Sequence, residues 1–304
     1  MILEISNNST SIYRSCPKKY YWNYIKGLKP YKKSSALTLG SIVHSAFDMY
    51  YSGFSDLEVL KYINDTSNEN ISKATLEEEE ALVIVKYTAL AMWLSYPKDL
   101  SAFEEIKPEV EMKVELFPGV EILLKIDGLV KQNGKYWIRE LKTTGMSFSQ
   151  FESRCKSSPQ CSLYTYAVRK SGIHVEGVIY DFIKKPLLRK RVNDTKDEFG
   201  KRIVEDMKDR PEFYFKRHYS YRSNEELELF EEDLIETAKD MLHRFQTNSW
   251  YRNPDACWNF NSACQYMPIC FAKKPDELTM NVYYEQKPIN PEKGGKPCQK
   301  IIKK

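Results

Sequence analysis

Several features of other protein classes are missing from this chain. No apolar run in its 304 residues approaches the length that crosses a bilayer, and the opening Met-Ile-Leu-Glu-Ile-Ser lacks the basic stretch and long apolar region of a secretory signal. There is no internal repeat and no Gly-x4-Gly-Lys-Ser/Thr loop, so the chain carries no ATP motor of that type. These absences predict a cytoplasmic protein that makes no use of a membrane.

The composition is that of a soluble globular protein, with 42% hydrophobic and 29% charged residues. A chain of this length can bury a large core, as one elaborated domain or as two coupled lobes. The net charge is +4, and the basic residues partly cluster at Lys18-Lys19, Lys32-Lys33, Lys184-Lys185, Arg189-Lys190-Arg191 and Lys303-Lys304. Such clusters permit binding of a polyanion, although most charge runs are simply solvated faces.

Capping and periodicity signals make the opening third of the chain helical, without strand signals. Thr10-Ser11 can cap a short helix that runs through Cys16, and Pro17 begins another. Further apolar or amphipathic helices are predicted from Ala36 to Tyr51 and from Leu76 to Leu94.

Strand signals begin in the middle of the chain. Strict alternation from Glu109 to Phe117 predicts a half-buried strand, and two β-like runs then meet at Asn133-Gly134. After them come a helix from Ser158-Pro159 to Lys170, a strand from Val175 to Ile183 and a long helix from Ser223 to Asn248. Helices on both faces would cover such a sheet, so the predicted fold is α/β with a central mixed β-sheet flanked by helices.

The hairpin at Asn133-Gly134 carries the most informative side chains. Asn-Gly between apolar runs favours a tight primed turn, because both central residues of that turn need a positive φ. Pairing the strands about the turn brings Asp127 near Glu140. Lys142 projects from the same face as Glu140, because alternate residues of a strand point the same way. Two carboxylates and one ammonium group therefore converge.

This arrangement suits a divalent cation held beside a phosphodiester. Mg²⁺ and Mn²⁺ prefer carboxylate oxygens, and such an ion polarises a phosphoryl oxygen and makes a bound water a stronger nucleophile. A nearby ammonium group offsets the charge that develops on the phosphate. An Asp…Glu-x-Lys pattern is weak support when it stands alone, since Glu-x-Lys is common on solvated strand faces. The rest of the chain must therefore decide its meaning.

Four short motifs follow one another in a specific order. They are Leu39-Gly-Ser-Ile-Val-His44, Lys125-Ile-Asp127-Gly, Glu140-Leu-Lys142-Thr-Thr-Gly145 and Gln160-Cys-Ser-Leu-Tyr164. In this order and context the chain resembles the RecB-like nucleases of the PD-(D/E)XK superfamily. The resemblance implies a restriction-endonuclease-like fold with an N-terminal helical section and a Cys-rich C-terminal staple.

Carried over residue by residue, the resemblance implies a metal held by His44, Asp127 and Glu140, with the carbonyl of Leu141 as a further ligand. An imidazole among oxygen ligands would make Mn²⁺ competitive with Mg²⁺. Lys142 would position or activate the attacking water, or would stabilise the pentavalent phosphate. These roles rest on the family, since a lone His on a helix is more often an ordinary core or surface residue.

Gln160 and Tyr164 are assigned auxiliary catalytic roles. They are four residues apart on a predicted helix, so they share one face and could contact Lys142, the metal-bound water or the DNA backbone. An isolated pair of this kind would be interpreted as a solvated Gln above a core Tyr. The motifs leave out the other histidines, His174, His218 and His243, which receive no function.

The cysteines give a second, independent signal. Seven cysteines without an export signal argue for reduced thiols or metal ligation over a disulfide framework. Cys257, Cys264 and Cys270 lie near the C-terminus and Cys16 lies near the other end, and four thiolates suit a [4Fe–4S] cluster or tetrahedral Zn²⁺. This layout is similar to the iron–sulfur staple of the AddB and CRISPR-associated branches of the same nuclease group, in which the cluster clamps the two ends of the domain together.

One spacing departs from that resemblance. Those branches commonly have two residues between the first pair of the C-terminal trio, whereas six separate Cys257 from Cys264. A [4Fe–4S] cluster is the first interpretation, with Zn²⁺ or free buried thiols as alternatives. The cysteines not expected to be ligands are Cys155, Cys161 and Cys298.

The domain prediction is a single nuclease domain over residues 1–290. Within it a helical section at about 36–105 is inserted, a catalytic core spans about 106–183, and the C-terminal helix and Cys segment span 223–271. Residues 291–304 are polar, Gly-rich and basic, and are expected to form a disordered tail.

The leading functional prediction is a metal-dependent deoxyribonuclease. It would be an exonuclease acting on DNA ends or single strands in recombination, repair or DNA processing, through in-line attack of a metal-activated water. A helicase or recombination partner would supply any ATP motor. The alternative is a DNA-binding, recombination-accessory module without hydrolytic activity. A structural zinc protein with an incidental acidic hairpin would require the motif order to be accidental.

Overall fold

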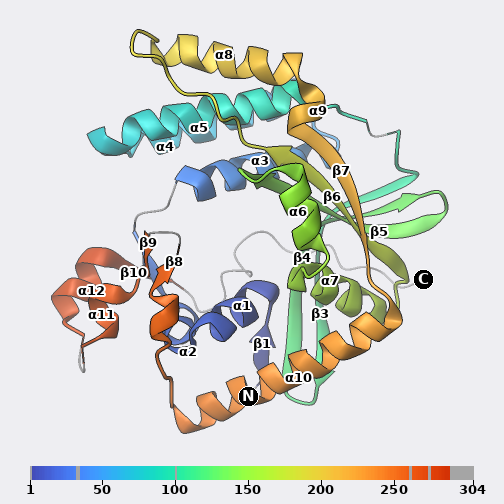
Figure 1. Cartoon of the computed structure of the whole chain (residues 1–304), viewed down its shortest axis with the longest axis vertical. Helices are drawn as coiled ribbons and strands as arrows, with labels where there is room; N and C mark the ends of the chain where they lie inside the picture. The colour runs from blue at the N-terminus through green and yellow to red at the C-terminus, as the bar shows by residue number, and fades with distance from the viewer. Residues whose placement is uncertain (1, 32–34, 100, 260–261, 273–274, 288–304) are drawn as a thin grey trace. The chain divides into compact units, whose positions relative to one another are not determined.

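The computed structural model describes residues 2–31, 35–99, 101–259, 262–272 and 275–287. Six strands form a mixed central sheet with the order β1-β4-β5-β6-β7, in which β3 also pairs with β4. Helices flank the sheet (Figure 1). The predicted α/β fold, with a central mixed β-sheet between helices, is therefore confirmed.

The described residues divide into two compact units. Unit 1 takes its residues from 1–33, 111–125 and 224–304, and unit 2 takes them from 34–110 and 126–223. The long strands β3 (Glu105–Phe117) and β4 (Val120–Gln132) contribute to both units. The single nuclease domain over residues 1–290 stays a prediction, and the tail expected at 291–304 lies outside the described residues.

Unit 2 contains most of the sheet. Its remaining strands are β5 (Lys135–Thr144), β6 (Val175–Lys184) and β7 (Phe215–Tyr221). Its helices are α3 (Ser35–Tyr51), α4 (Asp56–Ser72), α5 (Leu76–Ser95), α6 (Phe148–Cys155), α7 (Pro159–Lys170), α8 (Lys196–Asp209) and α9 (Pro211–Tyr214). β5 runs antiparallel to β4 and parallel to β6, and β7 runs antiparallel to β6. Asn133 and Gly134 join β4 to β5 with φ angles of 51° and 73°, which confirms the predicted primed turn.

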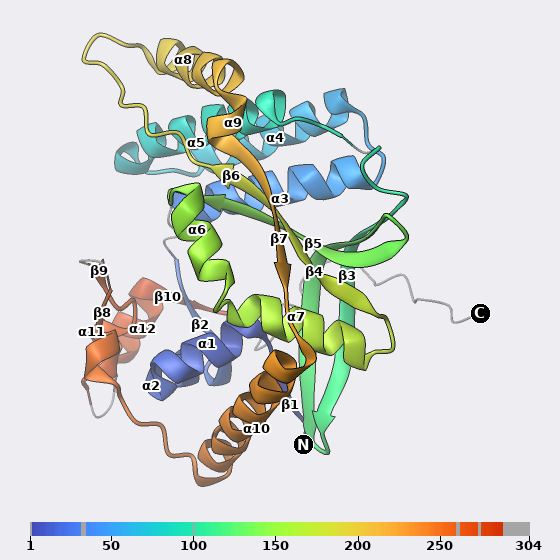
Figure 2. The same cartoon turned by 45° about the vertical axis from the view of Figure 1, so that its right-hand side comes forward.

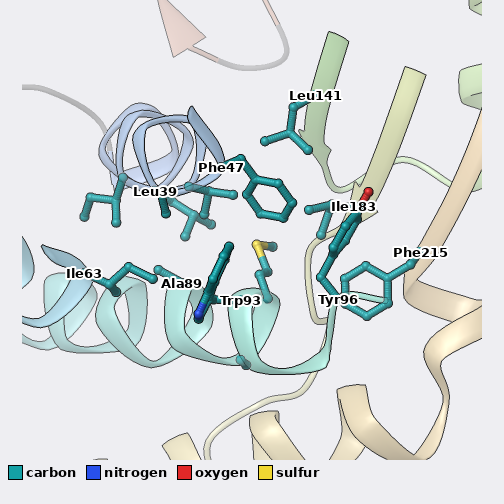
Figure 3. Packing of buried hydrophobic residues seen from close by; sticks show 14 of the residues in the cluster. Leu39, Phe47, Ile63, Ala89, Trp93, Tyr96, Leu141, Ile183 and Phe215 are labelled. Carbon is teal, nitrogen blue, oxygen red and sulfur yellow. The ribbon is translucent and has the colours of Figure 1, made fainter. Parts of the chain in front are cut away.

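One face of β5 and β6 is buried against α3 and α5. Leu141 and Ile183 project from this face into the core, as Figure 3 shows. There Phe47 of α3 packs edge-to-face on Trp93 of α5, with ring centroids 5.6 Å apart. Fully burying a side chain such as Phe47 is worth roughly 1.5–3 kcal/mol. This packing fixes α3 against the sheet, and with it the side chains that α3 presents to β4.

The opposite face of the same strands is covered by α6 and α7, which follow one another in Figure 2. Phe151 of α6 packs edge-to-face on Tyr180 of β6, with ring centroids 5.4 Å apart. Tyr180 is the register partner of Glu140, so both side chains lie on this second face. The carboxylate of Glu140 is therefore placed under helices and not in open solvent.

In unit 2, α5 packs along both α4 and α8, and Figure 1 shows α8 alongside α5. The close approach depends on Gly200 of α8, because a Cβ atom there would lie 2.3 Å from the ring of Tyr87 on α5. The hydroxyl of Tyr87 in turn donates a hydrogen bond to Asp197. No helix in the described parts of the chain is both long enough and apolar enough to cross a membrane.

Apart from its share of β3 and β4, unit 1 gathers elements from the two ends of the chain, and most of them are short. They are β1 (Leu3–Ile5), α1 (Asn7–Ser15), α2 (Pro17–Tyr20), the π-helical turn η1 (Tyr21–Ile25), β2 (Leu28–Pro30), α10 (Asn224–Thr247), η2 (Pro254–Ala256), β8 (Trp258–Asn259), β9 (Ser262–Ala263), α11 (Met267–Cys270), α12 (Glu277–Tyr283) and β10 (Tyr284–Gln286). β10 pairs antiparallel with β2, and Figure 2 shows α11 and α12 beside β10. Trp22, Tyr266, Ile269 and Tyr284 form a separate buried cluster that joins the two ends of the chain.

The structure corrects some of the predicted elements. The opening third was expected to lack strands, but β1 and β2 are present; three residues each are too few to show a period of two. The first helix begins at Asn7 and not after Thr10-Ser11, because Ser6 caps it by accepting a hydrogen bond from the N–H of Ser9 at 3.2 Å. The predictions also passed over α4, α6, α8 and β7.

Candidate active site

Strands β4 and β5 bring Asp127 and Glu140 together at one end of the hairpin. The backbone N–H of Leu141 donates a hydrogen bond of 2.8 Å to Oδ2 of Asp127, which ties that carboxylate to β5. From α3, Nδ1 of His44 lies 3.2 Å from the same oxygen. The three side chains expected to bind a metal thus come from three elements of unit 2, and Asp127 contacts both His44 of α3 and the backbone of β5.

Glu140 is the most constrained of these groups, since its side chain is only 5% exposed. Its Oε1 atom accepts hydrogen bonds of 2.8 Å from Nζ of Lys142 and of 2.8 Å from Nε2 of Gln160. Its Oε2 atom is buried and has no hydrogen-bond partner among the described residues. A buried carboxylate oxygen without a partner is costly, so this atom calls for a proton, a water molecule or a cation.

Helix α7 supplies the two auxiliary residues. Ser158 caps this helix and Pro159 begins it, as predicted, so Gln160 stands in the first turn. Nε2 of Gln160 also lies 3.0 Å from the hydroxyl of Tyr164, one turn further on. The shared helix face was therefore predicted correctly. The contact of Gln160 with Glu140 was not, because it depends on how α7 lies on the sheet.

The pKa values of the three groups differ in direction. Burial raises the pKa of Glu140, and the charge of Asp127 raises it further against the opposing effect of Lys142. Burial also acts to raise the pKa of Asp127, but the hydrogen bond and charge of His44 hold it below its ordinary value. Burial disfavours the charged form of His44, yet Asp127 raises the His44 pKa overall. The charged forms of Asp127 and His44 thus favour each other, whereas the charged form of Glu140 is disfavoured.

Sequence reasoning missed Asp48, which lies one helical turn beyond His44 on α3. Burial, followed by the charges of Asp127 and Glu109, raises the pKa of Asp48 to about 7. The spacing of four residues from His44 is the signal that could have found it, because residues i and i+4 share a helix face.

The residues present fit a divalent cation in their chemistry. Two carboxylates, one imidazole and a nearby carbonyl are hard or borderline donors of the kind that Mg²⁺ and Mn²⁺ accept, and Oε2 of Glu140 is an unsatisfied acceptor. The described residues contain no group of three or more His, Cys, Asp or Glu side chains arranged as a ready metal cage. His44 and Asp127 bind each other in this structure, so a cation would have to exchange that contact for its own.

The four cysteines singled out from the sequence come together in unit 1. Cys16, Cys257, Cys264 and Cys270 all line one pocket, although 240 residues separate the first from the second. The N–H of Asn253 lies 3.4 Å from Sγ of Cys16 and links the two segments. Here too, the described residues show no preformed metal cage.

The irregular spacing between Cys257 and Cys264 has a structural explanation. β8 and β9 form an antiparallel pair in which Trp258 faces Ala263, and the N–H of Cys264 donates to the carbonyl of Cys257 at 2.7 Å. The pairing of β8 with β9 thus places Cys257 and Cys264 beside each other at the base of the strand pair. The longer spacing is compatible with a shared ligand.

The cysteines expected not to be ligands lie elsewhere where they are described. Cys155 and Cys161 are buried in unit 2, where burial raises the pKa of each thiol. Sγ of Cys161 lies 3.4 Å from the hydroxyl of Ser220. Cys298 falls outside the described residues.

Comparison with known proteins decides the family. The sequence profile of the PD-(D/E)XK nuclease superfamily matches residues 4–271. The chain belongs to this superfamily. Its members are nucleases, which cleave phosphodiester bonds by hydrolysis and generally use divalent metals such as Mg²⁺. The predicted membership of the PD-(D/E)XK superfamily is therefore confirmed.

The similarity of this PD-(D/E)XK nuclease to solved structures is distant. A proposed exonuclease from Eubacterium rectale is 15% identical over 92% of both chains, with a TM-score of 0.46. A protein from Vibrio cholerae is 13% identical over 67% of this chain and 56% of its own, with a TM-score of 0.17. No curated protein matches the sequence. Neither structural likeness is close enough to support an argument about the substrate.

Proposed function

We propose that this nuclease is a divalent-metal-dependent deoxyribonuclease that acts on DNA ends or single strands. The observation that carries the proposal is the buried, unpartnered Oε2 of Glu140 beside Asp127 and His44. An acceptor in that state is stabilised by a cation, and the remaining donors of the site have the chemistry to complete its ligand set.

The proposed metal ligands are His44, Asp127, Glu140 and the carbonyl of Leu141. When bound, Mg²⁺ or Mn²⁺ would polarise a phosphoryl oxygen and lower the pKa of a coordinated water. Within the protein, the N–H of Leu141 orients the Asp127 carboxylate through its 2.8 Å hydrogen bond. These contacts hold the oxygens in place before any ligand arrives, which lowers the reorganisation that catalysis would need.

Lys142 is proposed as the group that faces the phosphate. Its side chain is 31% exposed, so its ammonium group reaches solvent while it donates to Oε1 of Glu140. A positive charge at that place can stabilise the charge that develops on the phosphate or can orient the attacking water. Gln160 donates to the same Oε1 atom and would hold Glu140 steady while Lys142 moves toward substrate.

We also propose a metal centre at the four cysteines, a [4Fe–4S] cluster first and Zn²⁺ second. The support is their convergence on one pocket of unit 1 from the two ends of the sequence. Anaerobic purification tests the choice. Brown visible absorbance with bound iron supports the cluster, a colourless sample with one zinc per chain supports Zn²⁺, and the absence of both metals overturns the proposal.

The decisive experiment measures cleavage of end-labelled single-stranded DNA in Mn²⁺ by the parent protein and by Glu140→Gln. Glu205→Gln, on an exposed position of α8, is the matched control. We expect Glu140→Gln to abolish cleavage and Glu205→Gln to retain it. A circular single strand of the same sequence should resist digestion if free ends are required.

The same experiment distinguishes the second candidate function. If the parent protein binds this DNA but no cleavage depends on Glu140, the chain is a DNA-binding, recombination-accessory module and the proposal is wrong. RNA of the same sequence tests the preference for DNA. Blocking each DNA end in turn gives the polarity of digestion.

A further inference from the structure

Arg139 lies directly behind the carboxylate site and is completely buried, with 0% of its side chain exposed. It precedes Glu140 on β5, so its side chain points to the opposite face of the strand. Its Nη2 atom donates a hydrogen bond of 3.1 Å to the backbone carbonyl of Asp127. A buried cation thus holds the main chain of the residue whose carboxylate contacts His44.

The site is built around this guanidinium group. Its Cζ atom lies 3.7 Å from the ring centroid of Tyr51, and its Nη1 atom lies 3.7 Å from Oδ2 of Asp181. Stacking on an aromatic face and a facing carboxylate compensate part of the cost of burying an arginine. Part of the desolvation cost of burying Arg139 remains, because its Nε and Nη1 atoms have no hydrogen-bond partner among the described residues.

Gly128, which follows Asp127 in the sequence, provides the space for this side chain. Gly128 and Arg139 are direct partners across β4 and β5. A Cβ atom at Gly128 would lie 3.4 Å from Nε of Arg139 and 3.3 Å from the carbonyl oxygen of Lys107. The two residues of this Asp-Gly pair therefore have different roles. Asp127 supplies a carboxylate on one face of the strand, and Gly128 leaves room for the Arg139 side chain on the other.

We propose that Arg139 is a positioning residue for the metal site. By holding the backbone carbonyl of Asp127, Arg139 fixes the orientation of the main chain at that residue. The Asp127 carboxylate is thereby kept within hydrogen-bonding distance of His44 and of the Leu141 N–H. This inference rests on the proposed function, in which Asp127 is a metal ligand. It assigns to Arg139 no contact with substrate.

The chain offers a matched control in Arg217 of β7. Nε of Arg217 lies 2.9 Å from Oδ1 of Asp181, so both arginines pair with the same carboxylate. In the described structure only Arg139 also donates to the backbone of Asp127. Arg139→Lys and Arg217→Lys are therefore the same substitution at the same ion-pair network, and only the first removes the hold on Asp127.

Two readouts follow from this difference, and neither is enzymatic activity. The first is the affinity for Mn²⁺, measured from the electron paramagnetic resonance signal of the free ion. The second is the hydrogen-exchange rate of the Leu141 amide without metal, because that N–H donates to Asp127. We expect Arg139→Lys to weaken Mn²⁺ binding about tenfold or more, as for partners of metal ligands in general, and to speed Leu141 exchange. Arg217→Lys should leave both values within about twofold.

The proposal is overturned if the two variants change both readouts alike, or if Arg139→Lys changes neither. If Arg139→Lys does not fold, Gly128→Ala serves instead, because it presses on Arg139 from the other side; unchanged Leu141 exchange in that variant overturns the proposal. If the parent protein binds no Mn²⁺, the proposed function fails. The Leu141 amide still decides whether Arg139 positions Asp127.

Discussion

Replacing Asp48 by Asn should stabilise the metal-free protein at neutral pH and should do so in a pH-dependent way. Burial, with the charges of Asp127 and Glu109, raises the pKa of Asp48 from 3.8 to about 7. At about 1.36 kcal/mol for each pKa unit, ionised Asp48 costs the folded state about 4 kcal/mol. Asparagine keeps the shape of the side chain and cannot ionise, so that cost disappears.

The sign follows from proton binding. Between pH 3.8 and about 7 the folded state retains a proton on Asp48 that the unfolded state has released, so the free energy of unfolding falls as pH rises. The stability that Asp48 contributes is fully present below pH 3.8 and is lost once the pH passes about 7. The advantage of Asp48→Asn should therefore be near zero at pH 3.8 and reach its maximum above about pH 7.

Urea unfolding in the presence of a chelator, from pH 4 to pH 8.5, measures this difference directly. Asp56→Asn on α4 is the control, because the side chain of Asp56 is 61% exposed. Adding Mn²⁺ should reduce the gain from Asp48→Asn, since a cation at Asp127 favours the ionised form of Asp48. A gain that does not vary with pH, or a loss of stability above pH 7, would refute the electrostatic argument.

Three further outcomes are expected. Glu140→Gln should raise the melting temperature of the metal-free protein at neutral pH while it abolishes cleavage, because burial and Asp127 disfavour the ionised carboxylate. Gly200→Ala should lower the free energy of unfolding by roughly 1–3 kcal/mol, because its Cβ atom would meet the ring of Tyr87. Cys264→Ser should lower stability and release bound metal, whereas Cys155→Ser, outside the pocket, should release none.

A specific result would refute each of these three predictions. Unchanged melting of Glu140→Gln with and without chelator would mean that the buried carboxylate carries no electrostatic cost. In a Tyr87→Ala background, Gly200→Ala should become neutral or stabilising, because alanine favours a helix over glycine by about 1 kcal/mol; a persistent loss would locate the strain elsewhere. A Cys264→Ser variant with the same melting temperature as the parent protein would show that the proposed metal centre at the four cysteines is wrong.

The hairpin and the order of its chemistry were predictable from the sequence. Asn133-Gly134 adopts the positive φ angles that such a turn requires, and the pairing about it brings Asp127 toward Glu140. Lys142 lies beside Glu140 because strand residues two apart share a face. These features depend on residues close together in the chain, so a period and a turn signal are enough to find them.

The burial of Glu140 was not predictable in the same way. Its position on a strand gives its direction, but the cover over it comes from α6 and α7, which are later in the sequence. The same holds for the contact from Gln160 and for the unpartnered Oε2 atom. A strand pattern states which residues share a face and says nothing of what will be packed on that face.

The sequence by itself determined the superfamily, the α/β class and the identity of the candidate ligands, because these follow from motif order, local periodicity and turn chemistry. Tertiary structure alone decided that Arg139 donates to the carbonyl of Asp127 and that the charge of Asp127 raises the pKa of Asp48. It also decided that Cys16 lines the same pocket as the C-terminal cysteines. Asp48 and Cys16 are far along the chain from the residues they approach. Arg139 and Asp127 share one hairpin, but the distant residues Tyr51 and Asp181 contact the guanidinium group of Arg139. The distances of these contacts are set by packing of the core, which local sequence does not encode.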